Sequence, residues 1–169
     1  GQCIVDVGTG TGILALEMAR LGLRVVGVDS SEPMLKAAQA KSDAAGLSET
    51  HIDFRQGDAS HLPLEDGEAD GALAHMVLHS VASPADVIRD MARVVKPGGS
   101  VVAVDFLEHQ QEWMRDELGV LWLGFSLEDV RSWFHAAGLS EPETEHHDPA
   151  NRGRDLPGTF TASARRPIR

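Results

Sequence analysis

The sequence predicts an α/β protein with a doubly wound, mainly parallel sheet that has helices on both faces. Apolar, strand-like runs alternate with helix-like segments along the chain, and no internal repeat or low-complexity linker interrupts them. The first run, residues 4–7, leads directly into a glycine-rich turn at residues 8–12. A second apolar run ends at an acid, Asp29. Strand, glycine turn, helix, strand and acid is the order in which an open α/β sheet builds a nucleoside pocket.

The composition indicates one globular domain and excludes several classes of protein. The chain has 169 residues, of which 42% are hydrophobic and 24% charged, so it can bury a substantial core. The net charge of −11 argues against contact between this domain and nucleic-acid phosphates. No apolar run reaches membrane-spanning length, and no signal peptide is visible. The single cysteine, Cys3, excludes an intrachain disulfide and fits a reducing, cytoplasmic compartment.

The helices are predicted from their end signals and from apolar residues at helical spacing. Capping serines and first-turn prolines mark helix starts, and glycines mark helix ends. Residues 126–129 carry the pattern of a capping box. The predicted helices span residues 13–21, 30–46, 84–95 and 126–138.

The strands are predicted from short apolar or alternating runs that end at turn residues. Residues 101–106 form a continuous apolar run, as expected when helices cover both faces of a parallel sheet. A Trp-rich insertion follows at residues 110–125, and a polar loop at residues 148–158 separates two final strands. The predicted strands are residues 4–7, 23–28, 52–56, 70–75, 101–106, 143–146 and 159–164.

The glycine turn differs from two common phosphate-binding motifs. Gly8, Gly10 and Gly12 give the pattern G-x-G-x-G, whereas the dinucleotide fingerprint requires glycine at the next position, where this chain has Ile13. No Lys-Ser or Lys-Thr pair follows, so the turn is not a P-loop. The turn therefore indicates a nucleoside ligand of another kind.

Five segments together resemble the class I S-adenosylmethionine-dependent methyltransferases. Residues 6–12 fit the family's first motif, (D/E)-x-G-x-G-x-G, and residues 29–34 fit its second, D-x-S-x-x-M. Residues 57–63 fit G-D-A-x-x-L-P, and residues 70–79 resemble the fourth-strand motif. Residues 93–99 resemble R-V-L-K-P-G-G, which precedes strand five. The resemblance implies a Rossmann-like, seven-stranded sheet with an antiparallel last strand, and a methyltransferase that converts S-adenosylmethionine to S-adenosylhomocysteine.

The resemblance implies a role for each residue that matches a motif. The glycine turn would approach the methionine part of the cofactor, Asp6 would bind its amino end, and a carbonyl near His75 would bind its ammonium. Asp29 would bind both ribose hydroxyls, and Asp58 would accept from the adenine amino group. Asp29 could instead cap a helix, and Asp58 could instead be a turn acid. The cofactor-binding residues implied are Asp6, Gly8, Thr9, Gly10, Asp29, Ser30, Met34, Gly57, Asp58, Ala59 and His75.

Histidines at the end of the fourth strand are candidates for a general base. His79, or alternatively His75, lies where ligands bind in open α/β sheets. His79 is the predicted catalytic residue, and the alternative is a polar wall residue. No third metal ligand accompanies the two histidines, so no metal site is predicted.

The insertion after strand five resembles one subgroup of the family. Residues 106–115 and 121–126 resemble methyltransferase domains fused behind ArsR-type DNA-binding domains, and ubiquinone and menaquinone biosynthesis methyltransferases. This implies that Trp113, Trp122 and Phe125 wall a pocket for an apolar, small-molecule methyl acceptor. The alternative is that these aromatic residues are core or form a dimer face. A homodimer and a DNA-binding domain outside this chain are the protein partners that the resemblance allows.

The expected domain is a methyltransferase domain over residues 1–169, with the helices that usually precede the first strand, or a further domain, outside it. Two rival functions are considered. The first is a non-catalytic domain of a transcriptional regulator that senses S-adenosylmethionine or S-adenosylhomocysteine. The second is a nicotinamide-dependent oxidoreductase, which Ile13 disfavours.

Overall fold

The computed structural model describes residues 1–149 and 155–169 and forms an alternating α/β chain. Its elements, in chain order, are β1 (Cys3–Val7), α1 (Ile13–Arg20), β2 (Arg24–Asp29), α2 (Glu32–Ala44), β3 (Ile52–Gln56), β4 (Ala69–His75), the 3₁₀ turn η1 (Leu78–Ser80), α3 (Pro84–Val94), β5 (Val95–Phe106), α4 (Trp113–Leu118), α5 (Leu127–Ala136), β6 (Glu143–His147) and β7 (Thr159–Arg165). The predicted order of strands and helices is confirmed.

The strands form one seven-stranded sheet in the order β3-β2-β1-β4-β5-β7-β6. The pairs from β3 to β5 are parallel, and β7 runs antiparallel to both β5 and β6. The strand order reverses at β1, because β2 and β3 lie on one side of β1 and β4 to β7 lie on the other. The predicted mainly parallel, seven-stranded sheet with an antiparallel last strand is therefore confirmed.

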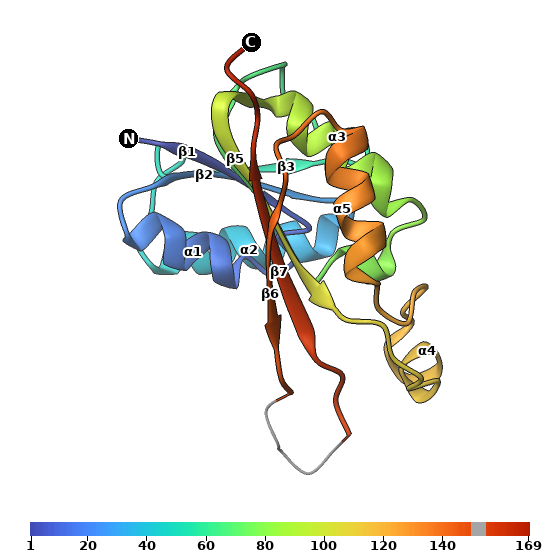
Figure 1. Ribbon diagram of the computed structural model, residues 1–169. Coiled ribbons are helices and arrows are strands. Elements are labelled where there is room, and N and C mark those ends of the chain that lie inside the picture. The colour runs from blue at the N-terminus through green and yellow to red at the C-terminus, as the bar shows by residue number, and fades with distance from the viewer. Residues whose placement is uncertain (150–154) are drawn as a thin grey trace.

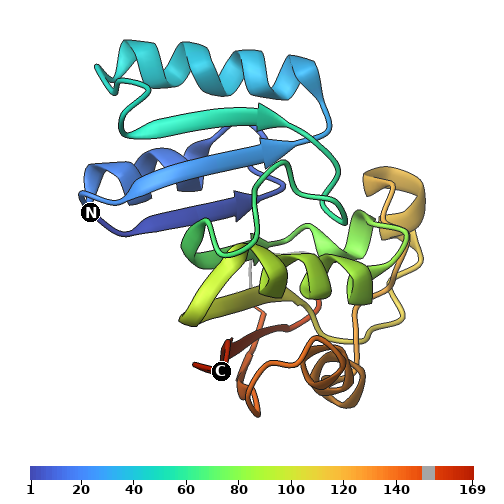
Figure 2. The same ribbon diagram turned by 90° about the horizontal axis from the view of Figure 1, so that it is seen from above.

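Helices cover both faces of the sheet, as a doubly wound fold requires. α1 and α2 pack on one face against β2 and β3, whereas α3 and α5 lie together on the other face (Figures 1 and 2). The main core lies between the sheet and α3 with α5, and a smaller cluster lies under α1. This two-sided cover explains why the central strands are buried on both faces.

The register brings three predicted site residues to one edge of the sheet. Val7 at the end of β1 pairs with Val28 on β2 and with Ala74 on β4. The next residues, Gly8, Asp29 and His75, therefore leave the sheet side by side. This edge holds the carboxyl ends of the parallel strands, where open α/β sheets bind ligands.

The fifth strand begins earlier than the sequence predicts. Residues 96–99 were expected to separate a helix from a strand at Val101, but β5 already starts at Val95, which pairs with Ala69. The next registered pair is Gly71 with Ser100, so the four intervening residues form an irregularity inside the strand. Gly98 there has φ 83°, a conformation that favours glycine.

The three serine caps form as predicted. Ser31, Ser83 and Ser126 each accept a hydrogen bond from a backbone N–H in the first turn of α2, α3 and α5. At α5 the donor is the N–H of Asp129, at 3.1 Å. The two predicted final strands also form, and the predicted polar loop between them includes residues 150–154, which lie outside the described residues. Across the described residues, the helices are too short or too polar to cross a bilayer.

Candidate active site

A cleft of about 430 Å³ opens at the carboxyl edge of the sheet, beside the glycine turn. One wall comes from the ends of β1, β2 and β3, and the other comes from η1 and the start of α3. Six of the predicted cofactor residues line it: Gly8, Asp29, Ser30, Gly57, Asp58 and Ala59. The cleft is lined by Gly8, Val28, Asp29, Ser30, Gly57, Asp58, Ala59, Ser60, Val77, Ser80, Val81, Ala82, Ser83, Asp86 and Val87.

Asp29 lies at the end of β2 and organises the turn opposite it. One carboxylate oxygen accepts from the backbone N–H of Gly10 at 2.8 Å, and the other accepts from Ser31 at 2.9 Å. The N-cap of α2 is Ser31, whose hydroxyl accepts from Met34. Asp29 therefore does not take the N-cap position, and its carboxylate keeps lone pairs for hydroxyl donors in the cleft.

Asp58 lies at the end of β3 on the same cleft wall. One of its oxygens accepts from both the N–H and the hydroxyl of Ser60, each at 2.7 Å. These hydrogen bonds lower the pKa of Asp58 below its ordinary value. The residue is thus a turn acid, as the simpler interpretation proposed, and its position in the cleft also suits the adenine role.

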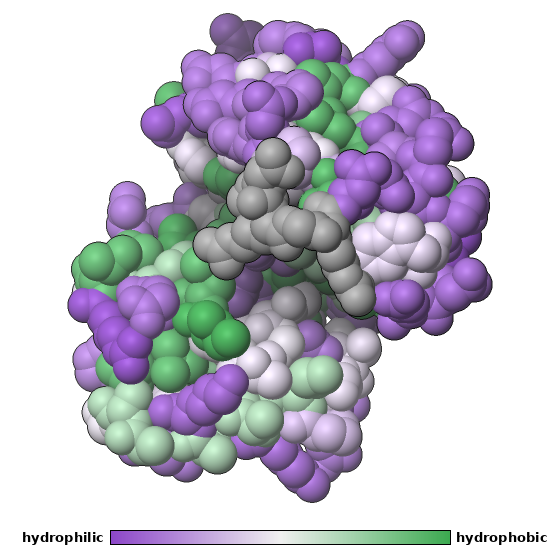
Figure 3. Space-filling view, turned by 90° about the horizontal axis from the view of Figure 1, so that it is seen from below, coloured by the Kyte–Doolittle hydropathy of each residue, from purple (hydrophilic) through white to green (hydrophobic). Residues whose placement is uncertain are grey.

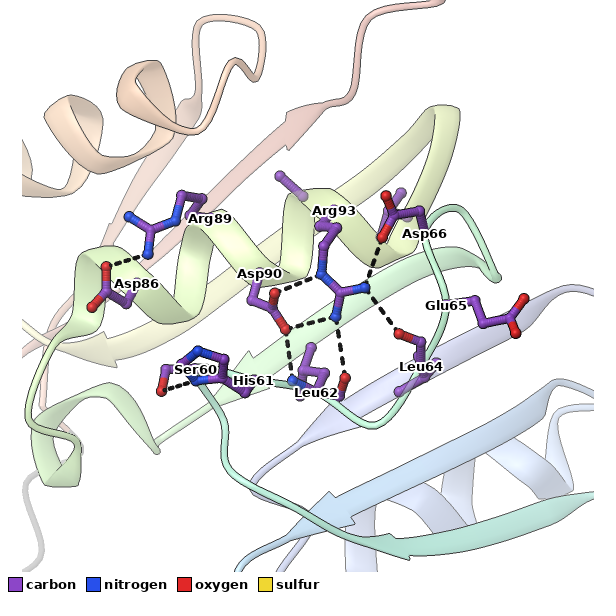
Figure 4. A network of polar contacts seen from close by, with 12 residues as sticks. Ser60, His61, Leu62, Leu64, Glu65, Asp66, Asp86, Arg89, Asp90 and Arg93 are labelled. Carbon is purple, nitrogen blue, oxygen red and sulfur yellow. Dashed lines mark hydrogen bonds and ion pairs between the residues drawn. The ribbon is translucent and has the colours of Figure 1, made fainter.

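A polar network ties the segment after Asp58 to α3 (Figure 4). The guanidinium of Arg93 donates to both oxygens of Asp90, to Asp66, and to the carbonyls of Leu62 and Leu64. Asp90 also accepts from the N–H of Leu62 at 2.6 Å. The segment between β3 and β4, which lies within the described residues, contains no helix or strand. These hydrogen bonds therefore fix the position of the cleft wall that contains Asp58.

A second cleft, of about 390 Å³, lies on the other side of the turn. It contains three more predicted cofactor residues, Asp6, Thr9 and His75, together with Ile13 and other residues of α1. Ile13 is 68% exposed, and Figure 3 shows hydrophobic surface on the left, over α1.

Asp6 is a buried acid at the inner end of this second cleft. Its carboxyl group accepts from the hydroxyl of Thr9 at 2.7 Å. Burial, with a smaller contribution from Asp29, raises the pKa of Asp6 to about 6, although the Thr9 hydrogen bond opposes the shift. A cation placed beside Asp6 would relieve this cost, so the site favours a positively charged group.

Gly8 separates the two clefts and lines both of them. Its φ is 71°, and a Cβ built on it would lie 2.5 Å from Cγ2 of Val77. A side chain here would therefore fill the space between the turn and η1. Gly12 has a different role. A Cβ built on Gly12 would lie 2.9 Å from the Cβ of Ala38 on α2, so the lack of a side chain at Gly12 lets α1 and α2 pack closely.

The first cleft is acidic. Asp29, Asp58 and Asp86 line it, and among its described lining residues there is no lysine or arginine. A cluster of negatively charged carboxylates repels phosphate groups and attracts cations. The cleft is thus suited to a neutral or cationic nucleoside and unsuited to a dinucleotide with its pyrophosphate.

His79 lies on η1 and contacts a buried acid that the sequence analysis did not select. Its Nδ1 is 2.8 Å from Oδ1 of Asp105, a residue of β5 with no exposed surface. Asp105 also accepts from the backbone N–H groups of His79 and Phe106. With the carboxylate acting as acceptor, the Nδ1–H of His79 donates, and its Nε2 keeps a free lone pair.

The three aromatic residues of the insertion have different environments. Phe125 is 4% exposed and belongs to the main core, where its ring meets Trp133 edge-on at 5.1 Å. Trp122 is 43% exposed, and its indole donates to the carbonyl of Val81 at 2.8 Å. The indole of Trp113 donates to Gln111 at 3.2 Å. Trp122 therefore contacts Val81, which lines the first cleft.

The structure brings most, but not all, of the predicted cofactor residues together. Met34 is 46% exposed and lies outside both clefts, as does Gly10, which contributes its N–H to Asp29. Asp86, Asp105 and His109 were not selected from the sequence. A recognisable signal existed for Asp105, since an acid inside an otherwise apolar strand must be paired when it is buried. Among the described residues, no group of three or more metal-binding side chains is present.

Comparison with known proteins agrees with this geometry. Residues 5–103 match the family model described as "Methyltransferase domain". The chain is 37% identical over 125 residues to a ubiquinone biosynthesis O-methyltransferase of Maricaulis maris, covering 73% of this chain and 48% of that protein. It is 41% identical over 108 residues to a demethylmenaquinone methyltransferase of Desulfitobacterium hafniense, covering 62% of this chain and 42% of that protein.

A solved structure shows the same fold. The SAM-dependent methyltransferase of Methanosarcina mazei superimposes with a TM-score of 0.84 at 20% identity, covering 99% of this chain and 93% of the other. The chain spans about half the length of the curated relatives that it matches. No observation favours the cofactor-sensing alternative. By its ordered motifs, its matched family model and its sheet, the chain belongs to the class I S-adenosylmethionine-dependent methyltransferases.

Proposed function

We propose that this chain transfers the methyl group of S-adenosylmethionine to a hydroxylated, apolar small molecule. The observation that carries the proposal is the position of Gly8 between two clefts, one containing Asp29 and Asp58 and the other containing Asp6 and His75. A cofactor with a nucleoside at one end and an amino acid at the other fits this division.

Each part of the cofactor has a matching group on the chain. Asp29 holds the ribose hydroxyls, and Asp58 with the neighbouring Ala59 binds the adenine. Asp6 and a backbone carbonyl near His75 hold the charged amino end. The sulfonium of the cofactor supplies a methyl group that is already activated, so the protein mainly positions the acceptor and removes its proton.

His79 is the proposed base. Asp105 fixes its ring with Nε2 free, which is the arrangement needed to accept a proton. The name of one relative, a ubiquinone biosynthesis O-methyltransferase, supports an acceptor that is methylated on oxygen. The name of the other, a demethylmenaquinone methyltransferase, supports only an apolar, quinone-type acceptor. A cytoplasmic location stays a prediction from the single cysteine. A homodimer, a fused DNA-binding domain and the extent of the domain beyond residues 1–169 stay predictions from the resemblance.

The test has two stages. Isothermal titration should show that the 169-residue chain binds S-adenosylmethionine and S-adenosylhomocysteine, and that NAD does not compete. Incubation with hydroquinone and catechol acceptors should then release S-adenosylhomocysteine. Stabilisation by NAD without binding of S-adenosylhomocysteine would contradict the proposal, and tight binding with no turnover of any acceptor would favour the sensing domain.

A further inference from the structure

His109 presents a buried hydrogen-bond donor that no group in the described structure satisfies. Its Nδ1 accepts from the backbone N–H of Gln111 at 3.1 Å, so the proton of the neutral ring lies on Nε2. That Nε2 is buried, and among residues 1–149 and 155–169 it has no hydrogen-bond partner. Burial, together with the nearby charge of Arg115, lowers the pKa of His109, which keeps the ring neutral. A buried donor without a partner is costly, and such groups are often reserved for a ligand.

His109 and His79 lie against the same aromatic ring. The centroid of the His79 ring is 5.2 Å from that of Phe106, and the His109 ring meets Phe106 edge-on at 5.8 Å. The two imidazoles have opposite hydrogen-bonding character, because Nε2 of His79 is a lone-pair acceptor whereas Nε2–H of His109 is a donor. A hydroxyl group has the complementary character, since it donates one hydrogen bond and accepts another.

The segment that contains Leu121 and Trp122 is attached to η1 by its backbone. The N–H groups of Leu121 and Trp122 both donate to the carbonyl of His79, at 2.8 and 3.1 Å. Leu121 and Trp122 are 52% and 43% exposed, which leaves apolar surface beside the imidazoles. α4 lies at the lower right of Figure 1, and its Met114 is fully buried.

We propose that His79 and His109 together bind one hydroxyl group of the methyl acceptor against Phe106, and so select hydroxylated aromatic compounds. This inference rests on the proposed methyltransferase function. In the reaction, the acceptor O–H bond breaks and its proton passes to Nε2 of His79. The oxygen forms a bond to the methyl carbon as the bond between that carbon and sulfur breaks, which leaves a methyl ether and a neutral thioether. His109 holds the same oxygen in line, and Asp105 is a positioning residue that fixes the His79 ring.

The first test reads the tautomers in the unmodified chain and needs no activity. Nitrogen-15 NMR of the histidine side chains should show a bare Nε2 for His79 and a protonated Nε2 for His109. His79→Gln and His109→Gln assign the two signals, and Asp105→Asn should mix the tautomers of His79. A protonated Nε2 on His79, or a bare Nε2 on His109, in the unmodified chain would overturn the inference.

The second test uses 2-naphthol and 2-methoxynaphthalene as probes, titrated in the presence of S-adenosylhomocysteine. The methyl ether can accept a hydrogen bond but cannot donate one, so 2-naphthol should bind about three- to tenfold more tightly. His109→Leu should weaken 2-naphthol by a similar factor while the affinity for S-adenosylhomocysteine stays unchanged, and His109→Gln, which keeps a donor, should lose less. His135→Gln is the matched control, because that ring pairs with Glu141 on an exposed surface.

The outcomes separate the two proposals. Failure of the chain to bind S-adenosylhomocysteine would remove the proposed function and this inference with it. Normal binding of S-adenosylhomocysteine, combined with equal affinity for the two probes or with no binding of 2-naphthol, would overturn the inference alone. A loss of 2-naphthol affinity in His135→Gln equal to that in His109→Leu would also overturn it.

Discussion

The carboxylate of Asp29 accepts a hydrogen bond from the backbone N–H of Gly10 at 2.8 Å, across a separation of 19 residues. This contact joins the end of β2 to the glycine turn after β1. Asp29 also lines the first cleft, so the side chain that shapes the turn is the same one that we propose as the ribose ligand.

We expect Asp29→Ala to weaken the binding of S-adenosylhomocysteine by at least tenfold without unfolding the domain. Hydrogen bonds to a charged acceptor contribute about 1.5–3 kcal/mol, and the variant loses those to the ribose and the contact that orders the turn. Isothermal titration measures the affinity, and circular dichroism checks the fold. Asp43→Ala, on the exposed face of α2, is the control. An unchanged affinity in Asp29→Ala would remove the ribose assignment.

Gly8→Ala and Gly10→Ala form a matched pair. Both glycines have positive φ, 71° and 55°, so both variants suffer the same kind of backbone strain of about 1–2 kcal/mol. A Cβ at Gly8 would lie 2.5 Å from Val77, whereas a Cβ at Gly10 has nothing within 4 Å. We expect both variants to lose stability in thermal melts, but Gly8→Ala to lose markedly more affinity for S-adenosylhomocysteine. Equal affinities would show that the space between the clefts is not needed.

The buried acid Asp6 should make stability fall as pH rises. Its pKa is about 6 in the folded state and near 3.8 in the unfolded chain, so the folded state binds more protons between these values. The free energy of unfolding therefore decreases as pH rises between these two pKa values, and above pH 6 the full cost of burying the ionised carboxylate applies. Asp6→Asn should be more stable than the unmodified chain at pH 7, by on the order of 2–3 kcal/mol, and should lose this advantage near pH 4. Urea unfolding at the two pH values measures the difference, and an advantage that does not change with pH would contradict the burial argument.

Arg93 should contribute far more to the free energy of unfolding than its neighbour Arg89. Arg93→Leu leaves the carbonyls of Leu62 and Leu64 without their donor and Asp90 without its partner, so we expect a loss of about 2–3 kcal/mol in the free energy of unfolding. The wall that carries Asp58 should loosen, with weaker binding of the nucleoside. Arg89→Leu removes one exposed ion pair with Asp86 and should cost about 0.5 kcal/mol or less. Similar losses in urea unfolding for the two variants would show that the network contributes little.

The fold was largely predictable from local patterns. Strand runs, serine caps and glycine stops each act within a few residues, so the order of elements and the cap at Ser126 could be predicted directly. Where the prediction placed a boundary between a helix and Val101, the structure begins the strand at Val95, because Val95 pairs with Ala69 on a neighbouring strand. That pairing depends on a residue 26 positions earlier, which no local pattern records.

The candidate site also has one part that local sequence patterns predict and one part that they do not. The sequence by itself determined the cofactor half of this protein, because its candidate residues lie within two positions of the ends of parallel strands, and these strands end at one edge of the sheet. These residues are Asp6, Gly8, Asp29 and Asp58. Only the tertiary structure decided the acceptor half. It pairs His79 with Asp105 and buries Phe125 in the core, and within the described part of the chain it leaves the Nε2–H of His109 without an acceptor. These relations arise where β4, β5 and the insertion meet in space, and the hydrogen bonds that define them depend on distances across the fold and not on spacing along the chain.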